Sequence, residues 1–133
     1  MSINLERMEG SKKINKSVFL IFCAVFILST QGIKAQIISN NGAYISIQAG
    51  TVVSMDSLNI DNTATISNDG IINISTINNA GTTQGNGTYN ILGNFINTGT
   101  FFSGTSNVNF YGVGQQTIGG NGDIEFHNIS INN

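Results

Sequence analysis

Beyond residue 34 the sequence has no lysine or arginine. All of its basic side chains lie at or before that position, at Arg7, Lys12, Lys13, Lys16 and Lys34. The acidic side chains that follow are Asp56, Asp61, Asp69, Asp123 and Glu125, so residues 36–133 carry a formal charge of −5. Proteins bind nucleic acids and anionic membranes largely through cations that neutralise phosphates. We therefore expect neither nucleic acid nor an anionic membrane surface among the partners of this region.

Cysteine is almost absent as well. The single cysteine, Cys23, lies inside an apolar run, and Phe22 occupies the place where a lipoprotein signal has a small residue. One thiol cannot form an intramolecular disulfide, so the fold does not depend on a disulfide framework. We interpret Cys23 as a small hydrophobic residue of that run.

The first 35 residues have the layout of a secretory signal peptide. Residues 12–17 read KKINKS, residues 18–28 read VFLIFCAVFIL, and Ala35 follows a short polar stretch. A basic region, an apolar run and a small residue in this order are typical of export signals. The apolar run rises only about 16 Å as a helix, whereas a membrane span needs about 20 residues. We predict a signal peptide at 1–35 that is cleaved after Ala35, no stable membrane span after cleavage, and a folded region at 36–133.

The folded region shows short alternations of apolar and polar residues, each bounded by Gly or Asn. Such runs are typical of β-strands, and no stretch after residue 36 keeps a helical period. The alternating apolar pairs are Ile45/Ile47, Leu58/Ile60, Ala64/Ile66, Ile72/Ile74, Tyr89/Ile91, Val108/Phe110, Ile124/Phe126 and Ile129/Ile131. The pattern predicts an all-β protein.

The breaks between these strands resemble one another. The triplet Asn-x-Gly occurs at 40–42, 68–70, 79–81 and 97–99. Because Asn and Gly enter left-handed backbone conformations most easily, each triplet predicts a tight corner. Repeated corners between short strands favour a solenoid, although an antiparallel sandwich would also explain the strands. We predict a short right-handed parallel β-helix (β-solenoid) of about four or five turns, at about 20 residues per turn.

The last strands predict a corner and an open edge. In DIEFHNISI (residues 123–131) the alternation slips by one residue at His127–Asn128, which indicates a corner there. We expect Asn128 to line the inner bend, with its amide stacked on amides of neighbouring turns. The final ISINN carries no charge that would deter pairing, so we expect self-association through this C-terminal edge strand.

Two stretches resemble repeats of a known group of proteins. NFYGVGQQTIGG (109–120), followed by EFHNISINN (125–133), is similar to the repeat V-x-F-x-G-x-x-x-Q-x-I-x-G … F-x-N-L-x-I-N-N. GTYNILGNFINTGTF (87–101) resembles the rung G-N-F-x-N-x-G-x-F of the same proteins, and KAQ (34–36) resembles their leaders. These are large secreted and cell-surface β-solenoid proteins of Bacteroidota, many exported by the type 9 secretion system. The resemblance covers most of residues 37–133.

The resemblance implies a β-solenoid stalk with an adhesin-like or structural role and no particular activity. It also implies further rungs and a C-terminal sorting domain, so that the chain resembles a truncated member of the group. The implied location is extracellular or at the cell surface, or the periplasm if no sorting domain follows.

Asp123 and Glu125 are the best candidate pair of catalytic carboxylates. Two residues apart on a strand, they share a face with backbone positions about 6.5 to 7 Å apart. Two carboxylates at such a separation suit an inverting glycosidase. The alternative, which we favour, is the solvated outer face of a strand whose inner face is Ile124 and Phe126.

Other candidate sites are weaker. Asp56, Asp61 and Asp69, with oxygen-rich neighbours, could contribute to a calcium site, but they match no EF-hand loop or calcium coil. His127 has no nucleophile or orienting group suggested nearby, and the glycine-rich stretches 81–88 and 112–122 lack the lysine of a phosphate loop. Thr63 and Thr65 resemble the Thr-x-Thr ranks of ice-binding solenoids, but the sequence shows no register of threonines at solenoid spacing.

We therefore predict an exported structural or adhesin-like cell-surface module that is not an enzyme and has no catalytic, cofactor or metal site. Its expected partners are surface glycans or the edge of another β-solenoid. The alternatives are a glycan-active β-helix enzyme that uses Asp123 and Glu125, and a non-functional fragment of a longer surface protein.

Overall fold

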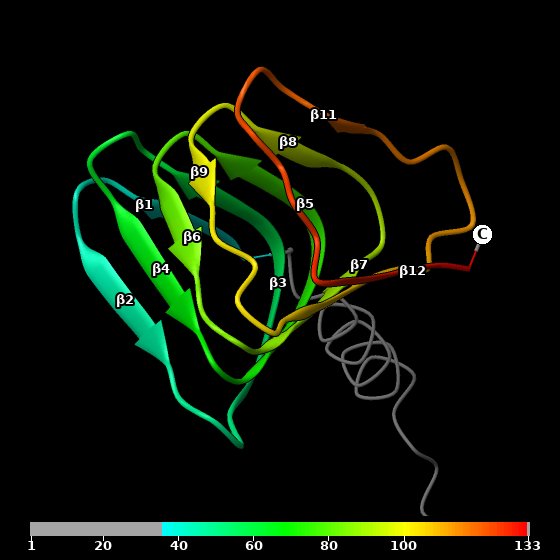
Figure 1. The fold of residues 1–133 in the computed structure, drawn as a ribbon, viewed down its shortest axis with the longest axis horizontal. Helices are drawn as coiled ribbons and strands as arrows, with labels where there is room; N and C mark the ends of the chain where they lie inside the picture. Colours follow the sequence, from blue (N-terminus) through cyan, green and yellow to red (C-terminus); the bar gives the residue numbers. More distant parts are fainter. Residues whose placement is uncertain (1–35, 133) are drawn as a thin grey trace, which may run out of the picture. The chain divides into compact units, whose positions relative to one another are not determined.

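The computed structural model describes residues 36–132, and in that range the chain is all-β with every strand pairing parallel. Five successive turns wind from the cyan strands β1 and β2 to the red strand β12 (Figure 1). The strands are β1 (Ile37–Asn40), β2 (Tyr44–Ile47), β3 (Val52–Ile60), β4 (Thr65–Asn68), β5 (Ile71–Asn79), β6 (Thr82–Gln84), β7 (Thr88–Ile91), β8 (Phe95–Asn97), β9 (Thr100–Phe101), β10 (Asn107–Phe110), β11 (Ile118–Gly119) and β12 (Asn128–Ile131). The predicted parallel β-solenoid is confirmed, and the antiparallel sandwich is wrong.

Each turn contributes to three faces of the solenoid. Face 1 consists of β1, the second halves of β3 and β5, then β8 and β11. Face 2 consists of β2, β4, β6 and β9, followed by a bridge from Phe101 to Ile124. Face 3 consists of the first halves of β3 and β5, then β7, β10 and β12. Residues in register therefore form columns that run along the solenoid.

The inward columns form the core, and its composition changes along the chain. Early turns bury aliphatic side chains such as Leu58 and Ile66. Later turns bury aromatic rings around Phe101, whose ring centroid lies 5.2 Å from that of Phe95 and 5.8 Å from that of Tyr89, both edge-on. Edge-to-face contacts of this kind add to the stabilisation that burial provides. The core is thus continuous from aliphatic to aromatic turns.

Four buried asparagines, which we name the corner asparagines, hold the bends between faces. They are Asn40, Asn68, Asn79 and Asn97, at 3, 0, 1 and 0 % exposure. Each donates from Nδ2 to a backbone oxygen one turn further on, in Thr65, Thr88, Thr100 and Asp123 respectively, at 3.3, 3.2, 2.9 and 3.0 Å. The Asn-x-Gly corners predicted from the sequence are confirmed at all four positions.

The reason for glycine at these corners differs from the predicted one. Among the glycines of the four Asn-x-Gly corners only Gly42 has a left-handed backbone, with φ of 88°, and no non-glycine residue among those described has positive φ. At Gly81 a Cβ would lie 2.2 Å from the backbone oxygen of Asp61, and at Gly99 a Cβ would lie 2.2 Å from the oxygen of Gly81. Glycine is needed there because successive turns approach too closely for a side chain.

The last turn contains the predicted corner, but Asn128 does not line its inner bend. Ile124 belongs to face 2 and β12 to face 3, so the chain turns between them. Asn128 is exposed and donates from Nδ2 to Oδ1 of Asn107 at 3.0 Å. The amide stacking is confirmed on the outer surface, because Asn128 opens β12 with its side chain in an outward column.

The predicted signal peptide and Cys23 lie outside the described residues. Within residues 36–132 no helix has the length and hydropathy needed to cross a membrane.

Candidate functional site: an amide-lined groove on face 1

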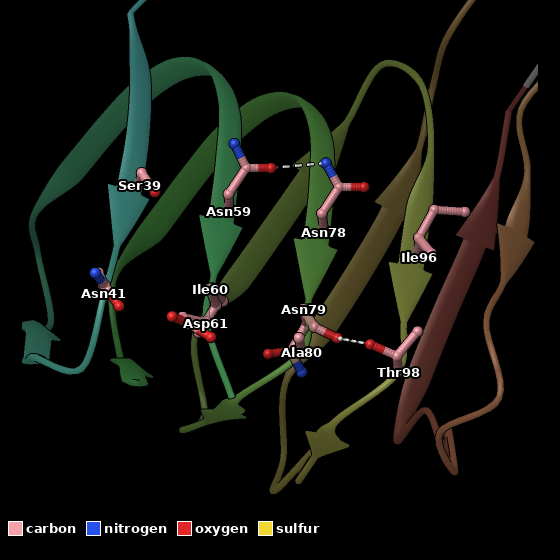
Figure 2. Close-up of a pocket in the computed structure, with 10 residues that line it drawn as sticks. All are labelled: Ser39, Asn41, Asn59, Ile60, Asp61, Asn78, Asn79, Ala80, Ile96 and Thr98. Atoms are coloured by element: carbon pink, nitrogen blue, oxygen red, sulfur yellow. Dashed lines mark hydrogen bonds between the residues drawn. The ribbon is translucent and has the colours of Figure 1, made fainter. Parts of the chain in front are cut away.

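A groove of about 480 Å³ runs along the outer side of face 1 at its corner with face 2 (Figure 2). It is lined by Ser39, Asn41, Asn59, Ile60, Asp61, Asn78, Asn79, Ala80, Ile96 and Thr98. These residues come from four successive turns, because β1, β3, β5 and β8 stack side by side on this face. The solenoid therefore builds the groove from equivalent positions of each turn.

One wall of the groove is an outward column of Ser39, Asn59, Asn78 and Ile96. Asn78 donates from Nδ2 to Oδ1 of Asn59 at 2.8 Å (Figure 2). An asparagine amide has two N–H donors and an oxygen acceptor, so this bond leaves the Asn59 donors and the Asn78 oxygen available. The wall thus presents polar groups of both kinds beside the apolar Ile96.

The opposite wall follows the corner. Asn41, Asp61, Ala80 and Thr98 are all exposed there. The Thr98 hydroxyl donates to the backbone oxygen of Asn79 at 3.4 Å, and the Asp61 carboxylate accepts from the backbone N–H of Asn62 at 2.6 Å. Asp61 is the one charged side chain that lines the groove. The groove therefore suits neutral ligands rich in hydrogen-bonding groups, and the absence of a lining cation disfavours anions.

A second ladder of amides runs along the outer side of face 3. Asn73 donates to the Ser54 hydroxyl at 3.2 Å, Asn90 donates to Asn73 at 2.8 Å, and Asn109 donates to Asn90 at 2.9 Å. Every bond in this ladder runs from one turn to the turn before it. Face 3 thus shares the chemistry of the groove wall, but none of its ladder residues lines the groove.

Asp123 and Glu125 lie on face 2 of the last turn, on either side of Ile124. Both carboxylates are exposed. Neither residue lines the groove on face 1. Ile124 and Phe126 pack against the core, as the favoured interpretation predicts, but the predicted strand is wrong because Ile124 forms only an isolated bridge to Phe101.

The other candidate residues are spread over the surface. Within residues 36–132 no three His, Cys, Asp or Glu side chains come together as a metal site, so Asp56, Asp61 and Asp69 do not form the considered calcium cluster. The Asp69 carboxylate accepts from the backbone N–H of Asn86 at 3.0 Å. His127 is exposed at the last corner.

The threonines are in register, contrary to the prediction. Thr65, Thr82 and Thr100 occupy one outward column of face 2 on three successive turns. Tyr44 precedes them in the same column. This register could not be read from the sequence, because the number of residues differs from turn to turn and equivalent residues do not recur at a fixed spacing.

The groove itself is not apparent from the sequence. No motif joins Asn59, Asn78 and Ile96 in the sequence. The available signal is a pair of Asn and Ile at 59–60, 77–78 and 96–97, but the turn lengths are needed to place these pairs on one face.

No protein-family model, no curated protein and no solved structure matches the chain.

Proposed function

We propose that residues 36–133 form a structural cell-surface module that holds a neutral glycan in the groove on face 1, without catalysis. The observation that carries the proposal is the groove of about 480 Å³, whose wall is built from Asn59 and Asn78. Amide and hydroxyl groups match the alternating donors and acceptors of sugar hydroxyls.

The lining of the groove favours a neutral sugar over other ligands. Residues 36–133 contain no lysine or arginine, so a phosphorylated, sulfated or uronic ligand would find no cation. Ile96 adds an apolar contact for the C–H surface of a sugar ring, and a few polar groups beside apolar surface are usual for small-molecule sites.

The solenoid supports a structural role. Its described strands pair in parallel through five turns, and the corner asparagines tie each bend to the turn that follows. Such a stack presents outward columns at a fixed spacing of about 4.8 Å along its length. The leader-like residues 1–35 support export, and the resemblance to Bacteroidota surface repeats supports a location outside the cell.

The test is the binding of neutral and acidic polysaccharides, measured by calorimetry and by retardation in affinity gels. We expect binding of a neutral polysaccharide and none of an acidic one. Asn78→Ala should weaken that binding about tenfold, since one good hydrogen-bonding group is worth about 1.4 kcal/mol. Asn90→Ala, the matched change on face 3, should leave the affinity unchanged.

Equal losses from both variants, or no binding by the unmodified protein, would contradict the proposal. The same samples separate the module from a glycan-active enzyme. Release of reducing ends that disappears in the double variant Asp123→Asn with Glu125→Gln would show catalysis and refute the proposed non-catalytic role.

A further inference from the structure

An apolar cavity of about 290 Å³ lies at the first turn of the solenoid. It is lined by Ile38, Ile45, Ser46, Ile47, Gln48, Thr51, Val53, Met55, Leu58 and Ile66. The apolar members are the inward side chains of the first turn and of the turn beneath it. Among the described residues, β1, β2 and the first half of β3 each pair on one side only.

The last turn has the complementary surface. Ile118, Ile129 and Ile131 lie in inward columns, yet they are 41, 47 and 61 % exposed. Among residues 36–132 no strand pairs with the far side of β11 or β12. Each end therefore exposes apolar side chains together with a row of unpaired backbone groups, which is a template for pairing with another strand.

The same columns begin at one end and finish at the other. The column of Ile38 ends at Ile118, that of Val53 ends at Ile129, and that of Met55 ends at Ile131. A first turn placed on a last turn would continue each of these three columns with an apolar side chain. The three strand edges would also meet in the same order, because both ends have the same three faces.

Charge does not oppose this contact. Asp123 and Glu125 point outward from face 2 of the last turn, one residue to each side of Ile124. The outward residues at the equivalent positions of the first turn are Tyr44 and Ser46, which carry no charge. The junction would therefore contain carboxylates on one side only.

We propose that the occupant of the apolar cavity is a second copy of this chain, whose last turn stacks on the first turn. The contact is heterologous, so it repeats and produces open chains of molecules rather than closed dimers. It buries the exposed isoleucines and pairs both sets of strand edges. The proposal does not depend on glycan binding.

The test is sedimentation velocity of the protein over a broad concentration series. The average mass should increase about twofold or more with concentration, because an open heterologous contact does not stop at one partner. Ile129→Lys places a charge in the contact and should give a monomer. Leu92→Lys is the matched control, since Leu92 is also 47 % exposed but lies in a middle turn, and it should associate like the unmodified protein.

A mixture of Ile129→Lys with the unmodified protein tests whether the first turn of one copy meets the last turn of another. Ile129→Lys keeps an intact first turn, so it should add to the last turn of an unmodified chain and shorten the assemblies. Circular dichroism of both variants must show unchanged β-structure. A monomer at all concentrations, as expected if another segment or partner covers the first turn, would overturn the proposal. Equal effects of the two lysine variants would overturn it as well.

Discussion

The corner asparagines and the asparagines of the outer ladders have the same side chain in opposite surroundings. Asn97 is fully buried, donates to backbone oxygens of Gly99 and Asp123, and accepts from Asn79 at 2.7 Å. Asn78 is exposed and makes one bond to Asn59. A buried amide that loses its partners leaves other polar groups unpaired, whereas an exposed one exchanges its partner for water. Burial therefore decides which asparagines hold the fold and which are available to a ligand.

The largest expected effect concerns the close approach of turns beside the corner asparagines. In Gly81→Ala the new Cβ would lie 2.2 Å from the oxygen of Asp61 and 2.4 Å from that of Ala64. Backbone must move to relieve this contact, so we expect a loss of about 3 kcal/mol or more in the free energy of unfolding. Urea unfolding measures it. Gly114→Ala, where no atom lies within 4 Å, should change stability by less than about 0.5 kcal/mol; similar losses in both variants would contradict the account.

Asn97→Ala tests directly whether a buried corner asparagine holds the fold. The change removes the donor to Asp123 and Gly99 and the acceptor for Asn79. We expect a loss of about 2 to 3 kcal/mol in the free energy of unfolding, because the buried amide of Asn79 loses its acceptor and two carbonyl groups at the corner lose their donor. Asn78→Ala should cost about 0.5 kcal/mol or less in the same urea experiment. The comparison fails if the exposed variant is the more destabilised of the two.

Thr83→Val tests the same comparison by removing a buried polar group that has no hydrogen-bond partner. Thr83 is 1 % exposed in the inward column between Ile66 and Phe101, and its hydroxyl has no hydrogen-bond partner. Replacing an unpaired buried hydroxyl by a methyl group should stabilise the fold by about 1 kcal/mol. Thermal unfolding provides the measurement, and Thr82→Val on the outward side should give no gain. A destabilised Thr83→Val variant would show that the hydroxyl has a partner.

The smallest effect at neutral pH is expected for Tyr89→Phe, beside the corner asparagine Asn68. Burial raises the pKa of the Tyr89 phenol above its ordinary value, and the neighbouring Asn68 amide lowers it to a smaller extent. The phenol donates to the backbone oxygen of Gln84 at 3.5 Å. Stability from the neutral phenol is fully present below the unfolded pKa of about 10 and is lost as pH rises beyond it. The variant should match the unmodified protein at pH 7 to within about 1 kcal/mol.

Above pH 10 the unmodified protein should lose stability faster than Tyr89→Phe, as followed by urea unfolding at several pH values. Parallel loss of stability in both proteins would mean that Tyr89 ionises as easily in the folded chain as in the unfolded one.

Much of the fold could be predicted from the sequence, because strand alternation and corners are local signals. Pairs such as Leu58 and Ile60 indicated strands, and the Asn-x-Gly triplets indicated corners. The physical role of Gly81 and Gly99 could not be predicted, since it arises from contact with the preceding turn. The outward position of Asn128 was missed for the same reason, because the inside of a corner is defined by neighbouring turns.

The candidate site could not be predicted, because it is a column and not a motif. Asn59, Asn78 and Ile96 come together only through the registers of β3, β5 and β8. A shift of one residue in any turn would point these side chains to the other side of the sheet. Asp123 and Glu125 stand out in the sequence as a candidate pair, although we favoured a solvated face for them, because two carboxylates at close spacing are visible without any knowledge of register.

The central claim is that exposed groove amides meet a ligand while buried corner amides hold the fold. Side-chain amide resonances of asparagine in nitrogen-15 correlation spectra test it in one titration with a neutral polysaccharide. The account predicts shifts for Asn59 and Asn78, with Asn68 and Asn97 unchanged. An absence of shifts, or shifts confined to Asn73, Asn90 and Asn109 on face 3, would contradict it.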